Sequence, residues 1–204
     1  AVICEVMNED GTMARKKALL DFSKKHNLKI GTIADLINYR IFNEQTVKRL
    51  EGKSVKTEHG KFNLILYKDL IFEETHIVLQ KGRISKNTPT LVRVQQSNLY
   101  HDLLNVDEFG TRWSVSDAMK KINKAGNGII LLIDGDSNKE NEFKEIRASK
   151  KKRKTVPNND PRRIGIGSQI LRDLGVKKIK LMGSEVRYPS LSGFDLEVTE
   201  YIKK

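Results

Sequence analysis

The stretch GIILLI, residues 128–133, decides the fold, because six consecutive residues without a polar side chain predict a strand that is buried on both faces. Residues 114–125 precede it and read as a helix that starts at Ser114 or Ser116 and turns its apolar positions inward. Residues 164–174 follow it and read as a second helix. Strands that alternate with helices in this way predict a layered α/β fold.

Further short segments, rich in β-branched and apolar residues, predict the other strands. These segments are residues 62–67, 76–80, 90–95, 178–182 and 196–202. Gly60 and Gly82 separate neighbouring segments, and Gly175 ends the second helix. Residues 42–52 are polar with scattered apolar positions, and we predict a short helical linker there.

The first 40 residues show a separate pattern. Residues 1–7 are apolar and β-prone, and residues 8–11 read as a tight turn. Two helices are predicted, over residues 13–26 and 33–39, each with a threonine in position to cap its start, and residues 28–30 predict a short strand between them. Such a piece is too short to bury a core of its own, so we expect it to pack on an upstream segment.

Composition limits the classes of protein that the chain can represent. Hydrophobic residues make up 38% of the chain and charged residues 31%, which is typical of a folded, water-soluble protein. No apolar run approaches the roughly 18 residues that cross a bilayer, so we expect no membrane partner. The single cysteine, Cys4, cannot form an internal disulfide and suits a reducing cytoplasm, which is the expected location.

The net charge of +12 favours anionic partners such as nucleic acid, phosphorylated metabolites or an acidic protein face. Lysine and glutamate are interspersed through most of the sequence, however, which is equally typical of a solvated basic surface. A run of five basic residues, 150–154, lies in a polar segment without periodicity that we predict to be a loop. The run is short and has no aromatic residues between its charges, so nucleic-acid binding is the weaker interpretation.

Two blocks of sequence near the start resemble the end of 3,4-dihydroxy-2-butanone 4-phosphate synthase. They are residues 1–15, AVICEVMNEDGTMAR, and residues 30–40, IGTIADLINYR. The resemblance implies that residues 1–41 are the C-terminal tail of such a domain. It also implies that Glu5 is the family's essential glutamate, which contacts ribulose 5-phosphate and can abstract a proton from it. The family's magnesium ligands lie in upstream motifs, so magnesium and the sugar phosphate are expected at the parent protein's site, and no cofactor is expected in this chain.

Three later blocks resemble GTP cyclohydrolase II. They are TEHGKFNLILY (57–67), ISKNTPTLVRV (84–94) and DPRRIGIGSQILRDLGVKKIKLM (160–182). The resemblance implies that residues 42–48 are a linker and that residues 49–204 form a layered α/β/α domain with a mixed sheet, in a protein expected to be a homodimer. Asp160 and Arg162 occupy the positions of that family's proton acceptor and catalytic arginine.

The sequence departs from the cyclohydrolase pattern where that family binds zinc with three cysteines. Residues 93–98 read RVQQSN, with Asn98 in the place of the first cysteine, and residues 105–113 contain neither cysteine nor histidine. A catalytic zinc site requires three protein ligands and an open position for water. His101 lies nearby, but one imidazole does not make a metal site. We therefore predict that zinc is absent.

The nucleotide contacts of the family are replaced as well. Asp134 and Asp136 stand where the family has a glutamate-glycine-arginine loop, and these carboxylates would repel a triphosphate. Glu185 and Tyr188 replace an asparagine and a lysine of the later phosphate-binding region. Asp160 and Arg162 would then have a structural use, as an ion pair at the start of a helix.

These observations favour a riboflavin-biosynthesis protein that converts D-ribulose 5-phosphate to 3,4-dihydroxy-2-butanone 4-phosphate and formate. The cyclohydrolase-like domain is expected to be non-catalytic and to stabilise, dimerise or regulate the upstream synthase domain. The alternatives are an active GTP cyclohydrolase II with altered metal use and a nucleic-acid-binding basic domain.

Overall fold

A computed structural model describes residues 3–96, 99–104, 112–133, 161–186 and 189–204. The chain divides into two compact units, Ala1–Arg40 and Ile41–Lys204, which we call unit 1 and unit 2. The predicted basic loop, residues 150–154, lies outside the described residues.

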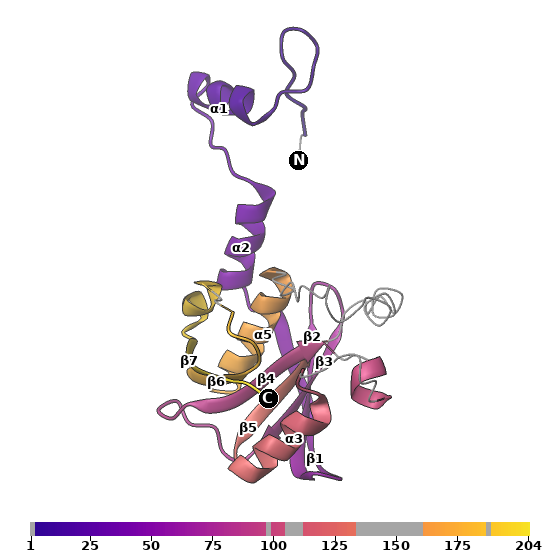
Figure 1. The fold of residues 1–204 in the computed structure, drawn as a ribbon. Helices are drawn as coiled ribbons and strands as arrows, with labels where there is room; N and C mark the ends of the chain where they lie inside the picture. Colours follow the sequence, from indigo (N-terminus) through magenta and orange to yellow (C-terminus); the bar gives the residue numbers. More distant parts are fainter. Residues whose placement is uncertain (1–2, 97–98, 105–111, 134–160, 187–188) are drawn as a thin grey trace, which may run out of the picture. The chain divides into compact units, whose positions relative to one another are not determined.

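Unit 2 is built on a seven-stranded mixed sheet with the strand order β1-β2-β3-β5-β4-β6-β7 (Figure 1). The strands are β1 (Val47–Thr57), β2 (Gly60–Asp69), β3 (Thr75–Lys81), β4 (Thr90–Gln96), β5 (Gly128–Ile133), β6 (Lys178–Met182) and β7 (Glu197–Ile202). The neighbouring strands β1, β2, β3 and β5 pair antiparallel. The neighbouring strands β5, β4, β6 and β7 pair parallel. The predicted mixed sheet is therefore confirmed.

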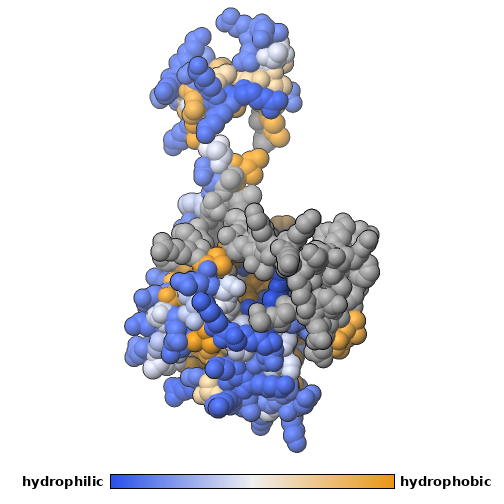
Figure 2. Space-filling model, viewed as in Figure 1, coloured by the Kyte–Doolittle hydropathy of each residue, from blue (hydrophilic) through white to orange (hydrophobic). Residues whose placement is uncertain are grey.

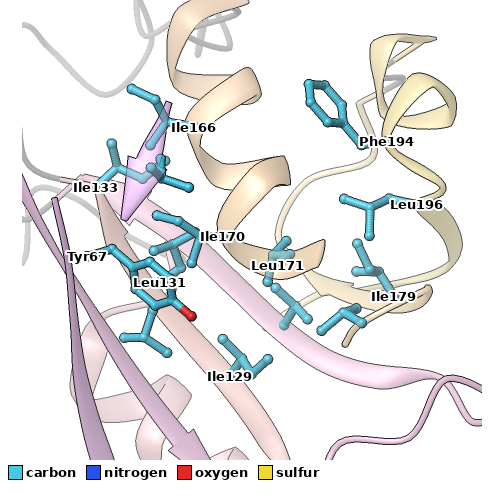
Figure 3. Close-up of a cluster of buried hydrophobic side chains, with 14 of the residues drawn as sticks. Tyr67, Ile129, Leu131, Ile133, Ile166, Ile170, Leu171, Ile179, Phe194 and Leu196 are labelled. Atoms are coloured by element: carbon cyan, nitrogen blue, oxygen red, sulfur yellow. The ribbon is translucent and has the colours of Figure 1, made fainter. Parts of the chain in front are cut away.

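Two helices cover opposite faces of the sheet, because successive side chains of a strand point to opposite sides. On β5, Ile130 packs in the same cluster as Ile122 of α3 (Val115–Ala125). Its neighbour Ile129 packs in the other cluster, with Ile170 of α5 (Pro161–Asp173). The buried side chains of α5 face those of β5 in Figure 3. The GIILLI strand is thus covered on both faces, and the predicted α/β/α layering is confirmed.

The ends of α3 and α5 follow the capping signals in the sequence. The Ser114 hydroxyl accepts a hydrogen bond from the backbone N–H of Asp117 at 3.1 Å, which makes Ser114, rather than Ser116, the N-cap. Gly126 ends α3 with a φ of +79°, and Gly175 follows α5 with a φ of +82°. Both values lie in the left-handed region that glycine adopts most readily.

The helical linker predicted over residues 42–52 is helical only at its start, because α2 (Ile33–Asn43) ends at Asn43 and β1 begins at Val47. Thr46 and Val47 are buried in unit 2, so residues 46–48 belong to the sheet unit rather than to a linker. The backbone N–H of Thr46 donates to Oε1 of Gln169 at 2.8 Å, and Gln169 Nε2 donates to the carbonyl of Glu44 at 3.1 Å. The sequence pattern does not indicate this strand, because β1 is an edge strand whose side chains are mostly polar and exposed. Backbone pairing with β2 holds β1 in the sheet.

A buried tyrosine ties α5 to the antiparallel half of the sheet. Tyr67 of β2 is fully buried, and its hydroxyl donates to Oδ2 of Asp173 at 2.5 Å. Burial raises the pKa of the Tyr67 phenol, and the hydrogen bond and negative charge of Asp173 raise it further. The phenol therefore stays protonated and remains a hydrogen-bond donor at physiological pH.

Unit 1 contains α1 (Lys16–Lys25) and the start of α2 (Ile33–Asn43). The predicted Thr32 cap is confirmed, since its hydroxyl accepts from the backbone N–H of Asp35 at 3.0 Å. The predicted strands over residues 1–7 and 28–30 are wrong for the described residues, which show only one isolated bridge, between Met7 and Met13. A β-prone segment needs a neighbouring strand to complete its hydrogen bonds, and the described part of unit 1 offers none.

The surface of the described residues is mostly hydrophilic in the view of Figure 2. None of the described helices is long and apolar enough to cross a membrane.

Gly128→Ala is expected to lower the free energy of unfolding by about 2–4 kcal/mol. Gly128 has a φ of +154°, and a Cβ there would lie 2.8 Å from both Ile122 Cγ1 and the Leu91 carbonyl oxygen. Gly126→Ala is the matched control, because its φ of +79° is also strained but a Cβ there meets nothing within 4 Å. Urea unfolding of the two variants measures the difference. Equal destabilisation would show that close packing at Gly128 contributes nothing.

Candidate functional site

A cavity of about 620 Å³ lies at the carboxyl ends of the parallel strands β4, β5 and β6. Gln96, Ile133 and Met182, the last residues of these three strands, all line it. β4 lies between β5 and β6 in the sheet. The chain passes from β4 to β5 through α3 on one face of the sheet and from β5 to β6 through α5 on the other face. Ligands of open α/β sheets bind at this kind of switch point. The cavity is therefore the candidate functional site.

Apolar side chains form most of the cavity wall, and polar groups gather at the strand ends. The apolar residues are Val94, Ile133, Ile164, Leu171, Ile179, Leu181, Met182, Val186, Leu191 and Val198. The polar residues are Arg93, Gln95, Gln96, Arg163, Ser168, Ser184 and Glu185.

Arg93 holds the strand ends together. Its Nε donates to Gln95 Oε1 at 2.8 Å, and its Nη1 donates to the backbone carbonyl of Met182 at 2.8 Å. Its Nη2 donates to the carbonyl of Trp113 at 3.3 Å. Gln95 in turn donates to the carboxylate of Asp102, at 3.0 and 3.1 Å. One guanidinium thus connects β4 to β6 and to the segment that precedes α3.

Arg163 brings a second guanidinium to the cavity from the first turn of α5. Its Nη1 donates to Oε1 of Gln96 at 2.6 Å. The two residues are 67 positions apart in the sequence, and both line the cavity, Gln96 at the end of β4 and Arg163 in the first turn of α5. They form a polar corner beside the apolar wall.

Arg162 lies outside the residues that line the cavity, although it is next to Arg163 in the sequence. Its Nη2 donates to Glu74 Oε2 at 2.5 Å and lies 3.9 Å from Asp69 Oδ2. Its guanidinium carbon lies 3.4 Å from the centroid of the Phe72 ring. Neighbouring helical residues point about 100° apart, which explains why one arginine faces the cavity and the other faces the β2–β3 loop.

Asp160 and Glu5 are the other two predicted site residues. Asp160 lies outside the described residues, so its predicted ion pair with Arg162 stays a prediction. Glu5 is exposed on an extended segment of unit 1, just before the turn that Asn8 and Gly11 close with a 3.0 Å backbone hydrogen bond.

Asp69, Glu74 and His76 place one potential metal-ligand atom each within 4.8 Å of one another. Their surroundings favour an ion-pair network. Asp69 Oδ1 accepts the backbone N–H groups of Ile71 and Phe72, at 2.7 and 3.3 Å. The guanidinium of Arg162 supplies the positive charge that two neighbouring carboxylates need. We therefore interpret the cluster as a clamp between the β2–β3 loop and α5.

Comparison with known proteins gives the family. Residues 48–203 match GTP cyclohydrolase II. The chain belongs to the GTP cyclohydrolase II family. Residues 1–39 match 3,4-dihydroxy-2-butanone 4-phosphate synthase, so the chain carries segments of two riboflavin-biosynthesis families. The whole of the cyclohydrolase II match lies in unit 2.

Two proteins with names from riboflavin biosynthesis match almost the whole chain. It is 43% identical over 203 residues to a 3,4-dihydroxy-2-butanone 4-phosphate synthase of Pseudomonas aeruginosa, with 98% of this chain and 55% of that protein covered. It is 39% identical over 213 residues to the riboflavin biosynthesis protein RibBA of Aquifex aeolicus, covering 98% of this chain and 52% of that protein.

A solved structure also resembles this chain. The crystal structure of RibBX, a two domain 3,4-dihydroxy-2-butanone 4-phosphate synthase from A. baumannii, matches with a TM-score of 0.61 and 38% identity. The match covers 98% of this chain and 53% of that one. The chain therefore spans about half the length of the relatives that it matches.

The described residues that line the cavity of this cyclohydrolase II-like unit do not supply the ligands of a catalytic zinc ion. Zinc sites use cysteine, histidine or carboxylate ligands, and a catalytic site needs three of them. Among the described residues that line the cavity, none is cysteine or histidine, and Glu185 is the one carboxylate. Asn98 and residues 105–111, where the family's ligands are expected, lie outside the described residues, as do Asp134, Asp136 and Tyr188.

Sequence reasoning missed Arg163 and Gln96 as site residues. The cyclohydrolase resemblance drew attention to Arg162, the arginine of the family motif. Arg163 could have been noticed as a helical neighbour of Gly167, because residues 163, 164, 167 and 171 recur on one side of a helix. Gln96 carries no such signal, since a lone glutamine after an apolar strand is common.

Proposed function

We propose that this chain is the C-terminal part of a riboflavin-biosynthesis protein that converts D-ribulose 5-phosphate to 3,4-dihydroxy-2-butanone 4-phosphate and formate. Its matches to the synthase family and to proteins named as that synthase support this activity for the whole protein. Unit 2 does not open the ring of GTP and serves the synthase as a structural, dimerising or regulatory domain. Magnesium and the sugar phosphate bind in the upstream part of the parent.

The position of Arg162 carries the proposal for unit 2. In the active family this arginine takes part in the reaction, whereas here its guanidinium donates to Glu74 and stacks on Phe72. The described residues that line the cavity are mostly apolar, and Glu185 is the one potential metal ligand among them. A domain can keep its core and lose its chemistry, because packing and catalysis rest on different residues. The presence of Arg162 is then explained by its structural contacts.

The chain is expected to release no formate from GTP above the uncatalysed background. Ring opening in the family needs water activated by zinc, and the described cavity residues do not supply a zinc site. The measurement is incubation of the chain with GTP, magnesium and added zinc, following formate and the pyrimidine product. Elemental analysis of the same sample is expected to show no stoichiometric zinc.

Turnover of GTP that disappears in the Arg162→Ala variant would contradict the proposal and support an active cyclohydrolase with altered metal use. Zinc near one equivalent per chain, without turnover, would contradict only the expected loss of metal binding.

Removal of unit 2 tests its role in the parent protein. The cut is best made after Asn43, because Glu44 and Thr46 already bond to Gln169 of α5. Synthase activity, oligomeric state and unfolding temperature of the truncated and full-length parent are then compared. A supporting domain predicts a change in at least one of these properties, and identical values for all three would contradict that role.

A further inference from the structure

We propose that the cavity at the ends of β4, β5 and β6 binds a small molecule with an apolar ring system and a single anionic group. This inference rests on the proposed non-catalytic role of unit 2 and names the class of ligand through which that role is regulated. The ligand class differs from a nucleoside triphosphate in both shape and charge.

The size and wall of the cavity set the body of the ligand. A volume of about 620 Å³ falls within the range of roughly 300–1,000 Å³ that is typical of small-molecule sites. The wall combines Ile133 of β5 and Leu181 of β6 with Ile164 and Leu171 of α5. Aliphatic side chains on both sides of a cavity favour a flat apolar group, because its burial removes apolar surface from water.

The helix that forms one wall is held close to the sheet. A Cβ at Gly167 would lie 3.3 Å from Ile133 Cδ1 and 3.6 Å from Leu131 Cδ2. Glycine at this position therefore lets α5 approach β5 closely. Tyr67 and Gln169 anchor the same helix through their bonds to Asp173 and to residues 44 and 46. The cavity is thus formed by fixed elements, which lowers the cost of ordering when a ligand binds.

The polar corner sets the charge of the ligand. Arg163 carries a planar guanidinium with five N–H donors, and its bond to the neutral amide of Gln96 orients it at the cavity. A carboxylate, sulfonate or phosphate oxygen is the acceptor that such a group binds best. The other lining arginine, Arg93, already connects three elements through its own hydrogen bonds.

The single acidic residue among the described lining residues limits the ligand to low charge. Glu185 lies at the exposed end of the cavity after β6. Arg93 and Arg163 are the two basic residues among the described lining residues, so these residues carry a net charge of about +1, two arginines less one glutamate. This small positive charge suits a ligand with one anionic group and disfavours a triphosphate.

The test uses two dyes that share a ring body and differ in charge. 8-Anilinonaphthalene-1-sulfonate carries one sulfonate, and N-phenyl-1-naphthylamine has the same aromatic rings without it. Each is titrated into the full chain with labelled isoleucine, leucine and valine methyl groups. We expect the sulfonate dye to shift the methyl signals of Ile133, Ile179 and Leu181 and to bind about tenfold more tightly than the neutral dye.

Variants of α5 then identify the anion contact. Arg163→Gln is expected to remove the preference for the sulfonate dye, whereas Arg172→Gln keeps it, since Arg172 is exposed on the same helix and does not line the cavity. GTP at the same concentration as the sulfonate dye is expected to leave that dye bound. The comparison of the two dyes on the unaltered chain tests the proposal even if Arg163→Gln fails to fold.

Three outcomes would overturn the proposal: equal affinity for the two dyes, displacement of the sulfonate dye by GTP, or shifts confined to methyl groups outside the cavity such as those of Leu20 and Leu28. These outcomes are separate from the test of unit 2 as a non-catalytic domain, which depends on formate release from GTP. A chain that turns over GTP fails that test whichever dye binds.

Discussion

Arg162→Ala is expected to lower the free energy of unfolding of the chain by about 2–4 kcal/mol. A loss of this order is typical when one partner of a largely buried ion pair is removed. The substitution leaves Asp69, which is 1% exposed, and Glu74 without the guanidinium that neutralises them. It also removes the stacking of the guanidinium on Phe72. Urea unfolding followed by circular dichroism measures the change.

The matched control is Arg163→Ala, one position further along α5. Arg163 donates to the neutral amide of Gln96, so its loss is expected to cost about 1 kcal/mol or less. The double variant Arg162→Ala with Glu74→Gln should be more stable than the two single changes predict together, because the buried charge has also been removed. If Arg162→Ala costs no more than Arg163→Ala, the clamp between α5 and the β2–β3 loop does not stabilise the fold.

In the full-length parent, Glu5→Gln is expected to lower synthase activity by about 10²–10⁴-fold, which is the typical contribution of a positioned acid–base group. Glutamine keeps the size of the side chain and removes the carboxylate that accepts the proton. Because glutamine and glutamate are close in size, the change should leave the unfolding temperature of the parent close to that of the unaltered protein. Formate release from ribulose 5-phosphate is the measurement.

Glu9→Gln is the control, since this glutamate is exposed on the turn that follows the same segment. It should retain activity close to that of the unaltered parent. Activity of Glu5→Gln within a few-fold of the unaltered parent would show that the residue's role does not follow from the synthase resemblance.

The central part of the fold could be predicted from local signals. The GIILLI strand and Gly175 after α5 lie where the sequence places them, and the N-cap of α3 is Ser114, one of the two candidates that the sequence offered. Each of these features depends on a few consecutive residues, because strand burial, helix capping and left-handed backbone are properties of short segments. The edge strand β1 was mistaken for a helical linker, since its exposed side chains give no alternating pattern.

The candidate site was predictable only in part. The sequence singled out Arg162, yet the cavity receives Arg163. Helical geometry alone says that the two side chains point apart, but not which of them faces the sheet. That choice depends on Glu74, which is 88 residues away and reaches Arg162 through the β2–β3 loop.

The sequence by itself determined the layered α/β architecture, the glycine that follows α5 and the absence of cysteine and histidine over residues 105–113. Tertiary structure alone decided that Gln96 meets Arg163, that Thr46 meets Gln169 and that Arg162 is held by the β2–β3 loop. The physical reason is the range of the interactions. Periodicity and capping act within a few residues, whereas a cavity is formed by side chains that only the packing of α5 across the strand ends brings together.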